Sequence, residues 1–217
     1  MTMHCKDRKC WKCEKTVKER HFCPKCTIIQ PPSGNEDFFD FMRLEKKLGL
    51  CTATLRMSYY DLSRKFHPDY FQNKDFLELQ YAMKHSSILN RAYFTLKNPI
   101  ARVRYLMMLE GVSENKDSGS IPEIFAENLF EIQECLMDYK MSSPDEQKAC
   151  FDNLINYKNR LQNDINDIDK HVHQYFIEYD ESDNTEKKMD VLNNISLILT
   201  ERNYFEKAKL EIEKEIE

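Results

Sequence analysis

The chain has 217 residues, of which only 4 are glycine and 7 are proline, while 32% are charged. This length leaves room for more than one domain of ordinary size. The scarcity of glycine and proline, with long stretches rich in Glu, Lys, Leu and Asn, favours an all-α chain over a β-sandwich or barrel. The sequence also lacks a glycine-rich loop that would cradle phosphate groups.

The net charge of -5 conceals two halves of opposite sign. Residues 1–111 carry 20 Lys and Arg against 12 Asp and Glu, a balance of +8, whereas residues 112–217 carry 12 against 25, a balance of -13. The two halves are therefore expected to face different partners. No run of 18 apolar residues is present and the first residues lack the core of a signal peptide, so we expect a soluble intracellular protein without a membrane contact.

The spacing of apolar residues predicts helices over most of the chain beyond residue 36. In the first half, we expect a helix over Asp37–Gly49, a second helix capped by Thr52 or Thr54 and ended by Pro68, a third that ends before Asn98, and a fourth through Leu109. A polar break follows and marks the best domain boundary. Beyond it, we expect three long charged helices as antiparallel neighbours, near residues 122–141, 144–180 and 185–215.

Four of the eight cysteines form two C-x-x-C pairs, Cys10 with Cys13 and Cys23 with Cys26, separated by nine residues. Two such turns can present four thiolates tetrahedrally to one zinc ion. The first 30 residues contain few aliphatic side chains, so a structural zinc ion would supply the folding free energy that a hydrophobic core cannot. We therefore predict a zinc knuckle with its linker over residues 1–35.

Other uses of this segment stay open. Cys5 or His21 could replace one of the four thiolates, and the same cysteines could hold an iron-sulfur centre. The basic residues would suit nucleic acid, but no stacking aromatics are interleaved with them, and the acidic second half would repel a phosphate backbone. Cys51, Cys135 and Cys150 stand alone and are expected to pack as small apolar residues.

The tripeptide His67-Pro68-Asp69 follows a basic amphipathic segment that carries Arg56, Arg64 and Lys65. Because proline ends the preceding helix, an imidazole, a rigid turn and a carboxylate are expected to be exposed together. In isolation, such a tripeptide indicates only a turn between two helices. The basic helix before it and the segment Asn90–Pro99 after it raise its specificity.

With these flanking segments, the chain resembles the J-domain family of co-chaperones. Within that family it is most similar to the HscB type, which serves iron-sulfur cluster assembly, through three motifs in the same order: Phe39-Asp40-Phe41, Lys65-Phe66-His67-Pro68-Asp69 and Arg102-Val103-Arg104-Tyr105-Leu106. The segment Phe22-Cys23-Pro24-Lys25-Cys26 resembles an N-terminal extension of some eukaryotic HscB-type proteins. The resemblance covers nearly the whole chain.

The resemblance implies an all-α fold in three parts. These are a small N-terminal zinc knuckle, a J domain over residues 36–112 built as a helical hairpin, and an antiparallel three-helix bundle over residues 113–217. The J domain and the bundle would form an L-shaped whole.

The resemblance also implies how the chain meets a chaperone of the DnaK type. His67, Pro68 and Asp69 would contact the ATPase domain of that partner, and the basic residues Arg56, Arg64 and Lys65 would steer the helix onto an acidic surface. The J domain would favour the hydrolysis-competent conformation of its partner and so raise its ATPase rate. The chain itself is then not an enzyme.

The C-terminal bundle is implied to bind an IscU-type scaffold protein through exposed apolar side chains. The candidates are Phe125, Leu129, Phe130 and Tyr204. The sequence departs from the family at Ala126 and Glu127, where large aliphatic residues are more usual. For each candidate, packing inside the bundle is the alternative explanation.

Together these features predict a co-chaperone that delivers a cluster-bearing scaffold to a DnaK-type chaperone. A general J-domain protein for unfolded clients is the main alternative, and a zinc-dependent nucleic-acid adaptor is a third. By resemblance, the protein would work in mitochondria or a related organelle. Because no presequence is visible, a cytoplasmic location is the alternative.

Overall fold

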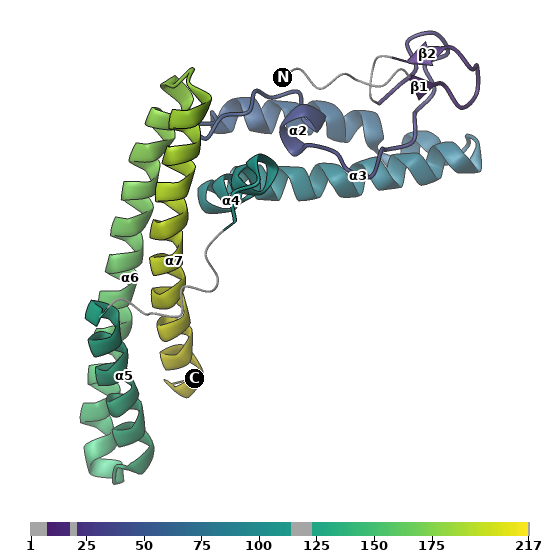
Figure 1. The fold of residues 1–217 in the computed structure, drawn as a ribbon. Helices are drawn as coiled ribbons and strands as arrows, with labels where there is room; N and C mark the ends of the chain where they lie inside the picture. The colour runs from purple at the N-terminus through teal and green to yellow at the C-terminus, as the bar shows by residue number, and fades with distance from the viewer. Residues whose placement is uncertain (1–7, 18–20, 114–122, 217) are drawn as a thin grey trace. The chain divides into compact units, whose positions relative to one another are not determined.

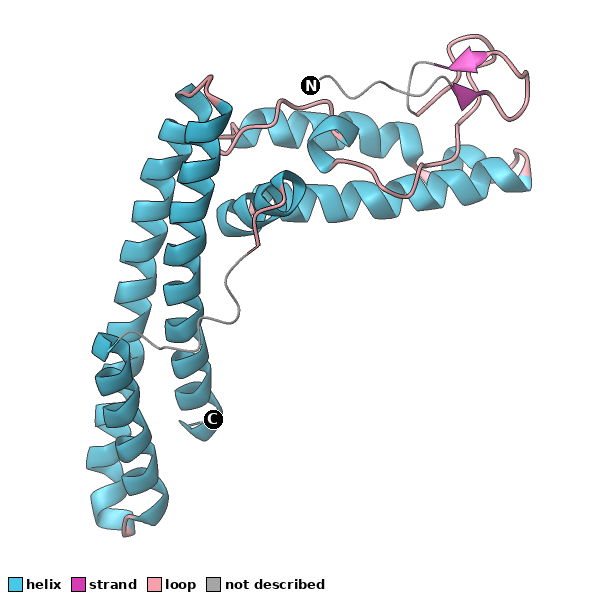
Figure 2. Ribbon diagram, viewed as in Figure 1, coloured by secondary structure: helices cyan, strands magenta, loops and turns pink. Residues whose placement is uncertain are grey.

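The computed structural model describes residues 8–17, 21–113 and 123–216. The described chain is built almost entirely of helices (Figures 1 and 2) and divides into two compact units, Met1–Tyr105 and Leu106–Glu217. This division falls within helix α4 (Pro99–Glu110), whereas the sequence places the domain boundary after residue 112. None of the described helices combines the length and the apolar character needed to cross a bilayer. The helical fold class is confirmed.

Strands occur in the N-terminal knuckle, where they form two equivalent turns. Strand β1 (Arg8–Lys9) pairs antiparallel with β2 (Thr16–Val17), and a single bridge joins Phe22 to Ile29. Each pairing encloses one C-x-x-C turn, because Lys9 pairs with Thr16 just as Phe22 pairs with Ile29. The knuckle is therefore a short structural repeat, of which the sequence reveals only the cysteines.

The rest of the first unit is a helical hairpin with short flanking helices. Its elements are α1 (Phe38–Phe41), α2 (Thr52–Phe66), the 3-10 turn η1 (Pro68–Phe71), α3 (Phe76–Lys97) and the start of α4. Helices α2 and α3 pack side by side (Figure 1) and bury Leu55, Leu62, Phe66, Ala82, Leu89 and Leu96. The N-cap of α2 is Cys51, so neither of the expected threonines caps this helix.

The first helix is much shorter than the sequence predicts. Apolar spacing indicated a helix over Asp37–Gly49, but α1 ends at Phe41. Arg43 adopts a φ of +57°, and the N–H groups of Arg43 and Leu44 bond back to carbonyl oxygens of α1. A left-handed residue ends an α-helix in this way. Leu48 is nevertheless fully buried. The apolar spacing after Phe41 therefore reflects buried side chains and not a continued helix.

The second unit contains three long helices, α5 (Glu123–Met141), α6 (Pro144–Glu181) and α7 (Thr185–Ile216), close to the expected ranges. Helix α6 packs along α7, and α5 packs against both (Figure 2). The ion pairs Lys158–Glu213, Arg202–Asp169 and Lys187–Glu178 follow one another in opposite order along α6 and α7, so these helices are antiparallel. Polar turn residues and a capping box at Ser143 separate the helices where the sequence predicts.

One titratable side chain lies deep in the first unit. His85 of α3 is 1% exposed, and its Nε2 atom lies 2.8 Å from the Gln30 carbonyl oxygen. Its Nδ1 atom has no hydrogen-bond partner. Burial lowers the pKa of His85, although the Gln30 carbonyl and Glu36 act in the opposite direction. A second proton on this ring would place an N–H without an acceptor inside the core.

We expect this histidine to make the first unit less stable in mild acid. Because the folded chain has the lower His85 pKa, the unfolded chain takes up the proton first as the pH falls below the ordinary value of 6.5. The free energy of unfolding should then fall by at most about 1.4 kcal/mol per pH unit. Urea unfolding of the wild type and of His85→Phe between about pH 5 and 7.5 measures the difference in slope, and parallel profiles would contradict the expectation.

Candidate functional site

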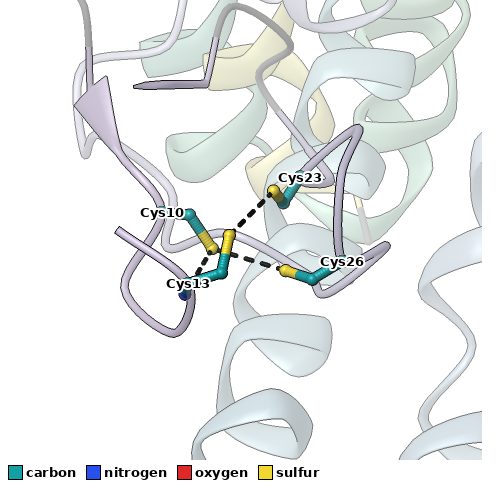
Figure 3. A group of neighbouring side chains, drawn as sticks. All are labelled: Cys10, Cys13, Cys23 and Cys26. Atoms are coloured by element: carbon teal, nitrogen blue, oxygen red, sulfur yellow. Dashed lines mark hydrogen bonds between the residues drawn. The ribbon is translucent and has the colours of Figure 1, made fainter. Parts of the chain in front are cut away.

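The four knuckle cysteines direct their sulfur atoms at one another (Figure 3). All four Sγ atoms lie within 4.8 Å of one another, with 3.6 Å between Cys10 and Cys26 and 3.7 Å between Cys13 and Cys23. A disulfide would require about 2.05 Å, whereas thiolates bound tetrahedrally to one ion at about 2.3 Å are about 3.8 Å apart. The group therefore has the geometry of a site for a single metal ion.

Two equivalent backbone turns present these sulfur atoms. Glu14 and Thr27, which follow the two C-x-x-C pairs, have φ values of +58° and +56°. Their N–H groups donate to the carbonyl oxygens of Cys10 and Cys23 at 2.9 and 2.8 Å. The left-handed conformation closes each turn tightly enough for both of its sulfur atoms to face the centre. Gln30 supports the group by donating from Nε2 to the Cys10 Sγ atom at 3.4 Å.

The thiols influence one another strongly. Burial would raise the pKa of Cys10, but the N–H groups of Cys13 and Lys12 and the adjacent thiols lower it to about 6. The N–H of Ile28 lowers the pKa of Cys26, yet burial and the three other sulfur atoms outweigh it and raise the pKa to about 12. Four thiolates can coexist at this distance only with a compensating cation, which deprotonates the thiols it coordinates.

His21 and Cys5 were the two alternatives to one of the four thiolate ligands. His21 is buried at 3% exposure, and its Nε2 atom lies 3.1 Å from the Phe41 carbonyl oxygen. Its ring packs edge-on against Phe41 and Phe66, so the hypothesis that His21 replaces a thiolate is wrong. Cys5 lies outside the described residues. Cys51, expected to pack internally, is exposed at the start of α2.

The tripeptide lies on the surface where α2 ends and η1 begins. The side chains of His67 and Asp69 are 52% and 70% exposed, and Pro68 is the first residue of η1, where a missing N–H costs nothing. The Asp69 N–H points at His67 Nδ1 at 3.4 Å, which leaves Nε2 as the ring nitrogen turned to solvent. An imidazole N–H, a rigid turn and a carboxylate are thus presented together.

The basic residues of α2 are exposed on the helix that precedes this turn. Arg56, Arg64 and Lys65 are all exposed. Lys65 pairs with Asp61 at 2.7 Å, a solvent-exposed contact that contributes little to stability. Arg56 and Arg64 are eight residues apart and therefore lie on the same side of α2. The tripeptide follows the last residue of this helix.

Sequence reasoning missed two neighbours of the tripeptide, Ser63 and Tyr70, and one exposed tyrosine of α2. A hollow of about 330 Å³ is lined by Ser63, Arg64, His67, Asp69 and Tyr70. Another tyrosine, Tyr60, is 55% exposed and lies midway between the two arginines at four-residue spacing. That spacing was the signal available in the sequence, but tyrosine on an amphipathic helix is usually assigned to its buried side.

Of the four scaffold-binding candidates, only two have described side chains. Phe130 of α5 is 71% exposed, and Tyr204 of α7 is half-buried; Phe125 and Leu129 lie outside the described side chains. Gln133 bonds to Glu211 at 3.2 Å and Lys140 to Glu215 at 2.7 Å, so α5 and α7 run in the same direction. Continuing that register places Tyr204 level with residues 126–129 of α5.

Two further apolar residues share the exposed side of α5. Met137 and Met141 are 66% and 87% exposed. They follow Phe130 by seven and eleven residues, which places all three on one face of the helix. The sequence contained this spacing, but the pattern alone does not say which face of α5 is covered.

Comparisons with known proteins point to one family. No protein-family model matches the chain. It is 32% identical over 144 residues to the iron-sulfur cluster co-chaperone protein HscB of Mus musculus, covering 64% of this chain and 61% of the relative. It is 35% identical over 108 residues to the Homo sapiens protein of the same name, covering 48% and 46%. A co-chaperone protein HscB homolog of Neisseria meningitidis is 32% identical over 120 residues, covering 54% and 72%.

Solved structures agree with these similarities. The crystal structure of human co-chaperone protein HscB matches with a TM-score of 0.69 and 26% identity, over 95% of this chain and 97% of that chain. The chaperone HscB from Vibrio cholerae matches with a TM-score of 0.50 and 19% identity, over 82% and 99%, which supports the fold alone. The sequence matches span about half to three fifths of the mammalian relatives.

The cysteine geometry predicts one tetrahedral metal site per chain. Titration of the metal-free protein with Co²⁺ should produce thiolate charge-transfer and d–d absorption that saturates at one equivalent. Cys26→Ser should weaken binding by at least about tenfold, because one of four thiolates is lost. Cys51→Ser is the matched control and should bind normally. Equal loss in both variants, or saturation at another stoichiometry, would contradict the prediction.

Proposed function

Since the chain belongs to the HscB family of iron-sulfur cluster co-chaperones, we propose that it stimulates the ATPase of a DnaK-type chaperone and delivers an IscU-type scaffold protein to it. The observation that carries the proposal is the exposed tripeptide beside a basic helix, because these are the groups a J domain presents to its partner. Membership in a co-chaperone family agrees with the expectation that the chain is not an enzyme.

The J-domain surface would act by contact. Arg56 and Arg64 attract an acidic surface of the chaperone and raise the rate of encounter. His67 and Asp69 then engage that partner from a turn whose backbone Pro68 restricts, so little conformational entropy is lost on binding. Stimulation follows if these contacts are stronger with the hydrolysis-competent conformation, because only differential affinity shifts a conformational equilibrium.

The knuckle fits structural zinc. Cys10, Cys13, Cys23 and Cys26 would hold the ion with all four positions filled, and zinc bound in this way supplies a covalent-like crosslink and no open coordination site. The short distances among the four sulfur atoms suit one ion better than a multi-iron cluster, in which the four thiolates are divided among separate iron atoms. The knuckle therefore has a structural task in this proposal.

The scaffold would bind the C-terminal helices. Phe130 is exposed on α5 instead of buried in the bundle, which favours a docking role over core packing for this residue. Phe125, Leu129 and Tyr204 complete the proposed surface, and the parallel register of α5 and α7 supports their proximity. The acidic charge of this half of the chain would select a partner with a basic surface.

By the family resemblance, we place this activity in mitochondria or a related organelle, with the cytoplasm as the alternative. Cluster assembly needs a reducing compartment, and the described cysteines are all free thiols. Fluorescence microscopy of the full-length protein with a C-terminal tag decides between the two locations.

We expect His67→Gln to reduce the stimulation of a DnaK-type ATPase by at least about tenfold, equal to about 1.4 kcal/mol. Because His67 is exposed, the variant should keep its fold and thermal stability. His171→Gln, an exposed histidine of α6, is the matched control and should stimulate normally. Steady-state ATP hydrolysis with and without scaffold is the measurement. Stimulation indifferent to scaffold would favour a general J-domain protein for unfolded clients, and no stimulation would contradict both hypotheses.

We expect Phe130→Ala to weaken scaffold binding by at least about 1 kcal/mol, or about fivefold, because aromatic anchors dominate interface energies. Isothermal titration calorimetry with an IscU-type scaffold measures the affinity. Ile177→Ala removes a similarly exposed apolar side chain from α6 and should change nothing. The same loss in both variants would show that Phe130 has no special place in the interface.

A further inference from the structure

The last residue of α2, Phe66, lies directly before the tripeptide and packs inside a cluster of aromatic rings. Its side chain is fully buried, with ring centroids 4.8 Å from His85, 5.1 Å from His21, 5.9 Å from Phe22 and 6.0 Å from Phe41. Phe22 stacks on it with only 15° between the ring planes. Two of these four rings belong to the knuckle, so the end of α2 is held by a segment remote in sequence.

The backbone at the same point is also held. The Phe66 carbonyl oxygen accepts a hydrogen bond from the Ser86 hydroxyl at 2.9 Å. Carbonyl groups in the last turn of a helix have no partner within the helix, so this bond fixes a group that would otherwise turn freely to water. The ring and the carbonyl of Phe66 together determine where the chain leaves α2, and His67 is the next residue.

Two buried hydrogen bonds hold the knuckle against this ring cluster. His21 of the knuckle reaches the Phe41 carbonyl oxygen at 3.1 Å, and His85 of α3 reaches the Gln30 carbonyl oxygen at 2.8 Å. The two imidazoles lie edge to face, with centroids 5.3 Å apart. His21 thus connects the knuckle to α1, and His85 connects α3 to the knuckle. Both bonds are buried, which makes their loss costly.

The knuckle cannot hold this position through a core of its own. Its buried cluster consists of Cys10, Val17 and Cys23, with Cys13, Cys26 and Ile28 packed against it, so most of its members are the thiols themselves. Without a metal, no covalent bond joins these four sulfur atoms to one another. The turn that begins at Cys23, next to Phe22, then loses its main constraint.

We infer that the metal-loaded knuckle positions the tripeptide, with His21 and Phe22 acting on it through Phe66. Loss of the ion would release Phe22 from Phe66, loosen the last turn of α2 and spread His67 over more conformations. The consequence for a chaperone rests on the proposed function. If only a fraction of the J domains holds the competent arrangement, the apparent affinity for the partner is reduced to that fraction of its intrinsic value.

The positioning itself can be measured without a partner. In the metal-loaded protein, the imidazole proton resonances of His67, assigned with His67→Gln, should be sharp, and Phe22→Ala should shift or broaden them while Co²⁺ absorption and helical circular dichroism are retained. Phe22→Tyr keeps the stacked ring and should restore the wild-type position. Lys25→Ala, an exposed change between Cys23 and Cys26, is the matched control. His171 and His173 of the second unit are internal standards.

Removal of the metal is a second test of the same inference. Chelation should move the His67 resonances in the same direction as Phe22→Ala, and added Zn²⁺ should reverse the change. Unchanged His67 resonances in both Phe22→Ala and the metal-free protein, with the helices intact, would overturn the inference. An equal response of Lys25→Ala or of His171 would also overturn it, because the effect would then not pass through Phe66.

The ATPase assay separates this inference from the proposed function. Phe22→Ala should raise the concentration required for half-maximal stimulation several-fold and leave the maximal stimulation unchanged, because the competent conformation becomes rarer but is not altered. A fall in maximal stimulation alone would count against positioning. If the wild type stimulates no chaperone, the proposed function fails, while the resonance comparison still decides whether the knuckle positions the tripeptide.

Discussion

The packing of aromatic rings around Phe66 is the interaction on which the first unit depends. It joins four segments in one place: the knuckle, α1, the end of α2 and the middle of α3. Phe41 and Phe66 are both fully buried, and burial of each such ring contributes about 1.5 to 3 kcal/mol. The buried histidines belong to the same cluster, where each has a carbonyl oxygen as its hydrogen-bond partner.

This arrangement separates the residues that hold the fold from those available to a partner. Phe66 is buried, whereas the next residue, His67, is half exposed. The charged side chains of α2 make at most weak surface contacts with the protein itself, as with Lys65 and Asp61. Their charge can therefore act on an approaching molecule at little cost to stability, and it should be screened by salt over about 10 Å.

The second unit follows a simpler principle. Two helices of 38 and 32 residues, α6 and α7, bury a continuous apolar stripe between them, and ion pairs along their edges keep the register. The shorter α5 covers one end of this pair and leaves Phe130, Met137 and Met141 exposed on its outer face. Apolar side chains exposed along one helix face are what a docking surface requires, and they add nothing to the stability of the bundle.

The local features of this protein could be predicted from its sequence. Apolar periodicity predicted every long helix to within a few residues, and the C-x-x-C spacing predicted the four-sulfur group, because both signals depend on residues close together in the chain. The motif around His67 was recognisable for the same reason. Three features emerge only from the packing of segments remote in sequence: the early end of α1, the exposure of Phe130, and the place of His21 in a ring cluster instead of at the metal site. These outcomes depend on contacts between segments such as Phe22 and Phe66, whose meeting no local pattern encodes.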